Sequence, residues 1–544
     1  MALRVTGVGV VVLSVIYLPW IVSVRNQEAP VIAWAFIFAA TVSAITLAIT
    51  VANSWNWKTP IPRPHRVGNE PTVGILIPTC GEPIPMVLRT VESVLAQNWP
   101  RDAMIVVVSD DAHSSQLEAA LRHYPDVHYH LPPSQNSPLR NGTAKSGNLN
   151  SAHAYLQGLD TRIDFIETRD ADDECGSTNF LRLAVGQLVD DVTIAYVQTI
   201  KEAQVSPSDP FNNREVMFYR NQMLSRNAAN AVFPCGSGLV WRREALDDIG
   251  GFPAWNLVED LQSGLQALRR GWNSCFIPIV GAVGQHAPED IPNVFKQRGT
   301  WATDALRLFL WKRQSGLNWR QRLQFVTLPL FYLNAFTYVI FVASVIATLF
   351  GHSPLWDEGW GALYVLAPYA LVSEGWLLTA NHPFNDRRVK QRHRIGDLWR
   401  VRVLWAGLIP VFIKATWLAV TGGPNRKPAY KVTRKTTASM WYWKETLPHL
   451  VIVATIGVGV VYAGVNNTLT NPTEWTLALL WGGLYLSFSA GFAWRGIHGT
   501  RAHRVVMSHL PKRWGPPPST SGVGNVGAPS HLAEPAAVPL VPAA

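Results

Sequence analysis

The chain has 544 residues, of which 48% are hydrophobic, and its formal net charge at pH 7 is +10. This length exceeds a single domain, and the apolar fraction, with 23 tryptophans, exceeds that of an ordinary soluble enzyme. Long uncharged runs flank a mixed central segment, which is typical of a membrane protein that carries a soluble domain. Because the basic residues crowd beside the apolar runs, we interpret the charge as membrane topology and expect no nucleic-acid partner.

Two apolar runs open the chain, at residues 5–24 and 31–53. Each is long enough to cross the hydrocarbon core, so residues 1–55 are predicted to form a transmembrane hairpin. A signal peptide is the alternative for the first run, but no clear small-residue cleavage site follows it and a second span comes at once. The Pro-rich linker after the hairpin carries Lys58, Arg63 and Arg66, which places it in the cytoplasm.

From about residue 70 the pattern changes to short β-rich runs that alternate with helical ones. This predicts an α/β domain with a largely parallel sheet over residues 70–320. All four cysteines lie in this segment at spacings that match no zinc site, which indicates free thiols in a reducing compartment. The expected strands are Val73–Pro78, Met104–Ser109, Phe165–Arg169 and Ile194–Gln198, and the expected helices lie near 84–97, 114–123, 145–158 and 178–190.

Residues 321–494 are predicted to form a second membrane region with four further spans. One apolar stretch in it, 398–421, lies between two strongly basic loops, which a crossing would put on opposite sides of the membrane. Arg400, Arg402 and Lys414 within it would each cost about 2.5–3.5 kcal/mol in a buried span. We therefore expect an in-plane helix on the cytoplasmic interface and six crossings in all. The expected spans lie near 323–350, 359–380, 447–466 and 475–494, and residues 495–544 form a basic and then disordered cytoplasmic tail.

The residues that carry chemistry follow the expected strands. The apolar run at 163–174 ends in carboxylates, and alternation along a strand would point Asp170 and Asp172 the same way, toward one Mg²⁺ or Mn²⁺ that carries a nucleotide. Earlier strands end in the sequence PTCGE (78–82) and in Asp110 and Asp111. With Lys145, these residues indicate a nucleotide-sugar site, with an acid for the base or ribose and a lysine for the diphosphate. A solvated lysine at a helix start is the alternative for Lys145.

Two further patterns point to an acceptor. Asp260 starts a helix, where it is either a general base for a sugar hydroxyl or an acid that serves the helix dipole. Adjacent Glu259 would raise the proton affinity of Asp260 and the helix terminus would lower it. Gln297 and Trp301 lie one helical turn apart, so an amide and an indole can face one sugar. An interfacial membrane anchor is the alternative for Trp301.

This ordered set of motifs resembles the processive membrane glycosyltransferases of the cellulose-synthase type. The resemblance implies a GT-A-like nucleotide-sugar-binding domain inserted in an α-helical transmembrane domain. It implies that Asp110, Asp111, Thr79 and Glu82 bind the UDP part and that Asp260 is the catalytic base. It also implies that Asp170 and Asp172 bind the nucleotide and metal and that Lys145 and Arg298 bind the nucleotide-sugar. The acceptor-binding residues that it implies are Cys235, Gln297 and Trp301. The motifs are PTCGE, AKSGNLN, DAD, SDPFNNRE, FPCGSGLVWRRE, VED, QRGTW and RKPAYKVTRK.

The last motif matches the gating loop of that type, at residues 424–440, with Tyr430, Val432, Thr433 and Lys435 in the matching positions. Three positions depart from the pattern. Thr300 stands where an Arg is expected, Val258 replaces a Thr, and Tyr430 replaces a Phe. These departures bear on linkage, donor choice and processivity more than on the fold.

The resemblance implies an inverting, metal-dependent transferase that extends a β-linked glucan from a UDP-sugar, with UDP-glucose as the expected donor, and passes the product through its own helices. It implies a multi-pass protein of the plasma (inner) membrane with a cytoplasmic catalytic domain and, as partners, the bilayer, the growing polysaccharide and accessory export subunits. One alternative is a non-processive transferase that adds one sugar to a lipid carrier. Another is an inactive scaffold or export channel of a polysaccharide assembly.

Overall fold

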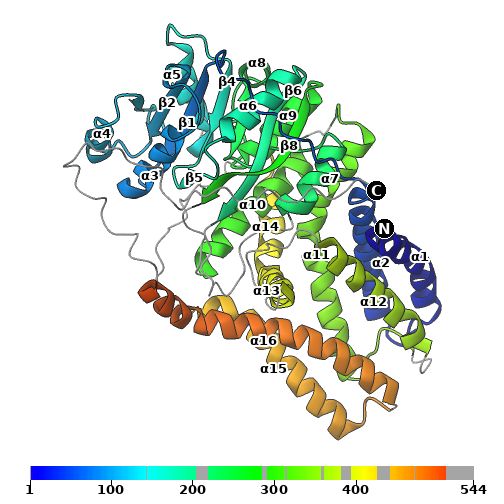
Figure 1. Ribbon diagram of the computed structural model, residues 1–544. Helices are drawn as coiled ribbons and strands as arrows, with labels where there is room; N and C mark the ends of the chain where they lie inside the picture. The colour runs from blue at the N-terminus through cyan, green and yellow to red at the C-terminus, as the bar shows by residue number, and fades with distance from the viewer. Residues whose placement is uncertain are drawn as a thin grey trace.

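The structure is a computed structural model that describes residues 2–142, 144–203, 218–284, 291–312, 315–356, 361–381, 394–425, 442–470 and 472–509. It consists of an α/β domain and a set of long helices. In Figure 1 the α/β domain lies at the top of the view and most of the long helices lie below it and to the right.

The α/β domain is built on one eight-stranded sheet with the order β3-β2-β1-β4-β7-β6-β8-β5. Strands β1 to β4 pair in parallel, but β7 is antiparallel to both β4 and β6, and β5 is antiparallel to β8. The strands are β1 (Val73–Thr79), β2 (Met104–Asp110), β3 (Val127–His130), β4 (Phe165–Thr168), β5 (Asp173–Cys175), β6 (Ile194–Ala203), β7 (Leu239–Arg242) and β8 (Asn273–Gly284).

The prediction of an α/β domain is confirmed, and the expected helices near 84–97, 114–123, 145–158 and 178–190 match α3, α4, α5 and α6. The expectation of a largely parallel sheet holds for β6 and β8 as well, which pair in parallel, but β7 and β5 run antiparallel to the strands beside them. Strand β7 was not expected from the sequence. It has only four residues and its first three are buried, so it shows no alternation of apolar and polar side chains.

The sheet is covered by helices on both faces, because side chains alternate along each strand. On β1, Ile75 and Ile77 lie in one apolar core, with side chains of α3, α4 and α6, while Leu76 lies in the other, with α5, α7 and α8. The sheet is therefore the middle layer of three. The helices are α3 (Ile84–Leu95), α4 (Ser115–Leu121), α5 (Ala144–Gln157), α6 (Phe180–Asp190), α7 (Met223–Ala228), α8 (Arg243–Asp248) and α9 (Glu259–Arg269).

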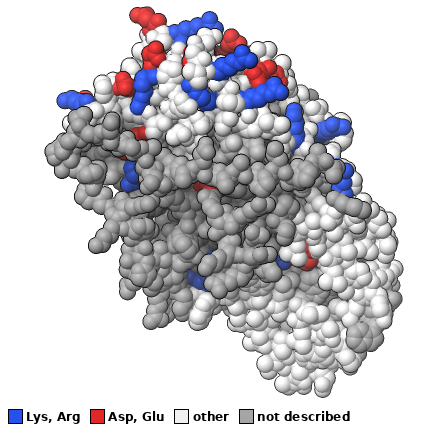
Figure 2. All heavy atoms as spheres, in the orientation of Figure 1, with Lys and Arg blue, Asp and Glu red and all other residues white. Residues whose placement is uncertain are grey.

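Six helices of the described chain are long and apolar enough to cross a membrane, which agrees with the six expected crossings. Figure 2 shows charged side chains gathered over the α/β domain, whereas the visible face of the helices at the lower right is almost without them. The helices are α1 (Ala2–Ser23), α2 (Pro30–Asn53), α11 (Trp319–Leu349), α12 (Gly361–Asn381), α15 (Trp443–Asn466) and α16 (Pro472–His509).

The stretch predicted to lie in the interface forms two helices, α13 (Arg394–Gly407) and α14 (Ile409–Gly422), and the chain bends by 45° between them. Taken together, the bent pair also has the length and composition of a span, which would make seven. Its placement in the membrane plane stays a prediction, as do the domain boundaries. Most of the basic loop before it, the gating loop from residue 426 and the tail from residue 510 lie outside the described residues.

Helix α7 joins the α/β domain to the membrane helices. The buried Arg226 donates to the carbonyl oxygen of Gln324 on α11 at 3.1 Å. Asn227 donates to the carbonyl oxygen of Lys58 in the linker at 2.9 Å, and also to that of Phe276 on β8 at 3.2 Å. Hydrogen bonds to main-chain carbonyls therefore fix the orientation of the α/β domain on α11 and the linker.

The linker before the domain packs closely on α6. The backbone N–H of His65 donates to the carbonyl of Arg182 at 2.8 Å, and Arg182 forms an ion pair with Glu70 at 2.8 Å. Gly186 allows this contact, because a Cβ added there would lie 2.0 Å from the carbonyl oxygen of Arg63.

Gly186→Ala is expected to destabilise the protein by about 1–3 kcal/mol, since overpacking forces the linker away from α6. Helix propensity alone predicts the opposite sign, about 1 kcal/mol of stabilisation. The midpoint of thermal unfolding, followed by tryptophan fluorescence, measures the effect. Gly158→Ala is the control, because a Cβ added there would lie 3.5 Å from the carbonyl oxygen of Tyr155, which is ordinary van der Waals contact. Equal midpoints for the two variants would contradict the packing argument.

Candidate active site

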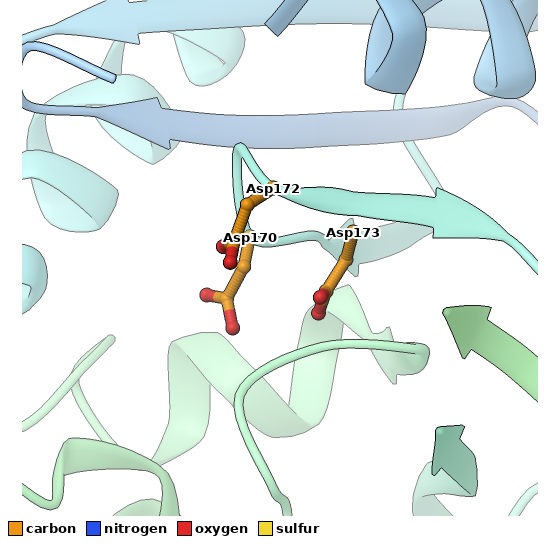
Figure 3. A group of neighbouring side chains, drawn as sticks. All are labelled: Asp170, Asp172 and Asp173. Carbon is orange, nitrogen blue, oxygen red and sulfur yellow. The ribbon is translucent and has the colours of Figure 1, made fainter. Parts of the chain in front are cut away.

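An acidic turn follows β4. The strand ends at Thr168, so Asp170 and Asp172 lie in the turn that leads to β5, and the N–H of Asp173 donates to the carbonyl oxygen of Asp170 at 3.0 Å. The expectation that both acids extend from a strand is corrected: the turn, and not strand alternation, brings them together. Asp173 joins them, and ligand oxygens of the three carboxylates lie within 4.8 Å of one another (Figure 3).

The side chain of Arg169 holds this turn in place. Its side chain is fully buried and pairs with Glu167 at 2.6 Å. The guanidinium also donates to the carbonyl oxygens of Gly281 on β8 at 3.1 Å and Glu174 at 3.2 Å, and it lies 5.2 Å from the Phe180 ring. One side chain thus connects β4, β5 and β8, and it fixes the direction in which the acidic turn leaves the sheet.

Two lysines contact the acidic turn. Lys145, in the first turn of α5, pairs with Oδ1 of Asp170. Lys201 on β6 lies 2.6 Å from Oδ2 of Asp170 and 2.8 Å from Oδ2 of Asp173. Burial by itself would raise the pKa of Asp170, but the two ammonium groups hold it well below its usual range. Asp170 is therefore ionised, whereas burial raises the pKa of Asp173.

Lys145 also links the acidic turn to the start of α9. Its Nζ lies 3.8 Å from Oε1 of Glu259 and 3.4 Å from the carbonyl oxygen of Gly236. Gly236 has a φ of 82°, and a Cβ there would lie 3.0 Å from Nζ of Lys145 and 3.4 Å from Oδ2 of Asp260. The glycine keeps open the space that Lys145 and Asp260 face. Burial raises the pKa of Asp260 above its usual value.

Glu259 provides a pH-dependent contribution to stability. Burial raises its pKa from 4.5 to about 8, with Lys145 lowering it and Asp260 raising it. Because the folded-state pKa is the higher one, the protonated carboxyl stabilises the protein below about pH 4.5, and this contribution is lost as the pH rises through about 8.

The unfolding midpoint of Glu259→Gln is therefore expected to fall less than that of the wild type between about pH 5 and pH 8. The expected difference is up to about 1 kcal/mol per pH unit. Thermal unfolding at a series of pH values measures it. Glu118→Gln, an exposed acid paired with Arg122, should follow the wild type, and parallel curves for Glu259→Gln would contradict the assignment.

The residues predicted to bind the nucleotide lie at the ends of β1 and β2, where Thr79 is opposite Asp110. The Thr79 hydroxyl donates to Glu82 at 2.8 Å. Asp110 is buried and accepts from the N–H groups of Ala112 and Ser114 at 2.9 and 2.7 Å and from the Tyr129 hydroxyl at 3.0 Å.

Asp111 forms a two-pronged ion pair with Arg140, at 2.7 and 2.8 Å. Both acids thus shape the loop after β2 by accepting hydrogen bonds from the protein itself. Their roles toward a nucleotide stay predictions.

The residues predicted to bind the acceptor are divided between two elements. Gln297, Arg298 and Trp301 lie on α10 (Ile291–Trp311), where the guanidinium of Arg298 stacks 4.8 Å from the ring of Trp301, which is 38% exposed. The Thr300 hydroxyl donates to the carbonyl of Lys296 within the helix, at 2.9 Å.

Cys235 lies in the loop before β7, beside Gly236, and its N–H donates to Gln198 at 2.7 Å. Tyr430, Val432, Thr433 and Lys435 lie outside the described residues. The Cys235 thiol contacts the carbonyl oxygen of Phe233 at 3.6 Å and packs against the apolar cores, so its role toward an acceptor stays a prediction.

The acidic turn fits a divalent cation. Carboxylate oxygens are the ligands that hard divalent ions prefer. Among the described residues, Oδ1 of Asp173 is buried without a hydrogen-bond partner, so one oxygen of the turn is available to an ion. Sequence reasoning missed Asp173 as a third ligand and Lys201 as a partner; the signals were the run DADDE and a lysine near the end of an expected strand.

The three-layer sheet domain, with an acidic turn, a lysine and a half-buried aspartate near one glycine, defines the class as a GT-A-like glycosyltransferase domain. Residues 71–303 match the family described as "Glycosyltransferase like family 2". The resemblance to the cellulose-synthase type is likewise confirmed, since catalytic subunits of cellulose synthases are among the relatives of this chain.

The catalytic subunit of cellulose synthase from Komagataeibacter sucrofermentans is 30% identical over 341 residues, which are 59% of this chain and 43% of the relative. The one from Pseudomonas fluorescens is 28% identical over 407 residues, 72% of this chain and 51% of the relative. The chain thus spans about half the length of these relatives. A solved mannosyltransferase from Pyrobaculum calidifontis, in complex with GDP-Man and Mn²⁺, is 17% identical with a TM-score of 0.48, covering 71% of this chain and 99% of its own.

Proposed function

We propose that this chain transfers glucose from UDP-glucose to a growing β-linked glucan, with inversion at the sugar, and that it moves the product across the membrane. The observation that carries the proposal is the arrangement around Gly236. There the predicted base Asp260 and the predicted diphosphate lysine, Lys145, border one space, and Lys145 also contacts the acidic turn. The similarity to cellulose synthase catalytic subunits supports glucose as the sugar.

In this proposal Asp260 takes the proton from the attacking hydroxyl of the acceptor. Its Oδ1 accepts from the N–H of Leu261 at 2.7 Å, which fixes the carboxylate at the start of α9. Burial raises its pKa toward the working pH, and this makes it a stronger base than an exposed aspartate. A positioned base of this kind contributes about 10²–10⁴ in rate.

Lys145 would bind the diphosphate of the donor, since its ammonium already lies between the acidic turn and Glu259. Asp170, Asp172 and Asp173 would hold Mg²⁺ or Mn²⁺, which supplies positive charge to the departing diphosphate. Most of the catalysis would come from positioning and charge stabilisation, because the protein forms no covalent bond to the sugar.

The proposal places the α/β domain in the cytoplasm and the chain in the plasma (inner) membrane, with accessory export subunits as further partners. The six candidate spans support a membrane protein. The free state of all four cysteines, among them the exposed Cys80, is consistent with a reducing compartment for the α/β domain.

The experiment that tests the proposal supplies purified protein in nanodiscs with a panel of radiolabelled UDP-sugars and Mg²⁺ or Mn²⁺, and separates polymer from small products. Polymer from UDP-glucose alone, digested by a linkage-specific β-glucanase, is the expected result. A single-sugar lipid product would replace the proposal with a non-processive transferase. Failure to bind or hydrolyse any UDP-sugar would favour an inactive scaffold or export channel.

A further inference from the structure

Lys201 contacts the acidic turn from β6. Its Nζ lies within hydrogen-bond distance of two of the three carboxylates, at 2.6 and 2.8 Å. Asp173, one of those partners, has a side chain that is almost completely buried, and Lys201 itself is about a quarter exposed. The lysine therefore closes the turn from the side of β6.

In this cluster the ammonium groups of Lys145 and Lys201 lie against the carboxyl groups of the acidic turn, so the protein itself supplies positive charge there. A divalent ion bonds to carboxylate oxygens at about 2.0–2.1 Å for Mg²⁺. An ammonium group that touches two of the same carboxylates would then stand beside the ion, where like charges repel.

We propose that Lys201 is a tethered cation that competes with the divalent ion for Asp170 and Asp173, and that the diphosphate of the donor relieves this competition by accepting the Lys201 ammonium. Lys201 is thus a positioning residue that makes ion and nucleotide bind together. The proposal rests on the proposed function only in taking the second ligand to be a nucleoside diphosphate.

The direction of the coupling follows from charge. When the ion displaces Lys201 in the absence of a nucleotide, the ammonium loses both carboxylate partners and gains only water. When a diphosphate is present, its oxygens give the ammonium new partners close to the site. Ion and nucleotide must then raise one another's affinity by the same factor, because coupling between two sites is reciprocal.

The test measures Mn²⁺ binding by electron paramagnetic resonance on the purified, membrane-held chain, with and without UDP. The wild type should bind Mn²⁺ about tenfold or more tightly with UDP than without it. Lys201→Met removes the charge and keeps most of the stem. It should bind Mn²⁺ alone about tenfold more tightly than the wild type, and UDP should raise its Mn²⁺ affinity by a smaller factor than in the wild type.

Lys201→Arg retains the charge and should keep the weak Mn²⁺ binding of the wild type, and Arg122→Met, in an exposed ion pair with Glu118, is the remote control. Tryptophan fluorescence melts establish that each variant is folded. If Lys201→Met does not fold, the test relies on Lys201→Arg. Without UDP, this variant should bind Mn²⁺ as weakly as the wild type does.

The proposal is overturned if Lys201→Met binds Mn²⁺ no more tightly than the wild type, or if Lys201→Arg binds it much more tightly. It is also overturned if UDP leaves Mn²⁺ affinity of the wild type unchanged. None of these readings requires sugar transfer. If the purified chain transfers no sugar but UDP still raises its Mn²⁺ affinity, the proposed function is contradicted and the inference stands.

Discussion

Asp260→Asn is expected to lower the rate of sugar transfer by about 10²–10⁴ while UDP still binds. The amide has the shape of the carboxylate and can still accept from the N–H of Leu261, so the start of α9 should keep its geometry. It cannot take a proton from an acceptor hydroxyl. The initial rate of sugar transfer at saturating UDP-glucose measures the effect, and a separate titration measures UDP binding.

Two controls sharpen this expectation. Asp160→Asn changes an exposed acid that follows α5 and should leave the rate unchanged. Glu259→Gln alters the neighbouring buried acid and should change the rate less than Asp260→Asn, because Glu259 contacts Lys145 and is not the proposed base. Full activity of Asp260→Asn would remove Asp260 from the role of base.

Arg169→Met should lower the free energy of unfolding by about 3–5 kcal/mol, the usual cost of removing one partner of a buried ion pair. Glu167, its partner, is fully buried and would keep an uncompensated carboxylate. The acidic turn would also lose the hydrogen bonds to Gly281 and Glu174 that set its direction. The midpoint of thermal unfolding reports the effect.

The double variant Glu167→Gln with Arg169→Met isolates the cause. Because it removes both charges, it should recover a large part of the lost stability. Recovery of stability without recovery of Mn²⁺ binding would show that Arg169 also positions the acidic turn. If the double variant is no more stable than Arg169→Met, the uncompensated charge of Glu167 is not the source of the loss.

Several parts of the site were predictable because they depend on chain order and local pattern. Lys145, Asp170 and Asp260 each follow or start a regular element, and the alternation of strands with helices indicated that such positions meet at one edge of a sheet. The membrane spans were predictable for the same reason, since an apolar run of sufficient length needs no partner to be recognised.

Other residues could not be assigned in this way. The nucleotide role of Asp110 stays a prediction, whereas its hydrogen bonds within the protein are seen only in the fold. Its oxygens accept from two N–H groups of the loop that follows it and from the hydroxyl of Tyr129, which lies 19 residues away on β3. Hydrogen-bond partners of this kind depend on how two strands pair, and no local pattern reports it.

The sequence by itself therefore determined the α/β domain, the six long apolar helices and the chain order of Lys145, the acidic turn and Asp260, because hydrophobic period and length act locally. Only the tertiary structure decided that β7 runs antiparallel between β4 and β6, and that Lys201 reaches Asp170 from a strand that is not its neighbour in the sheet. Charges separated by 31 residues meet only after the sheet has formed, so their pairing is a property of the fold.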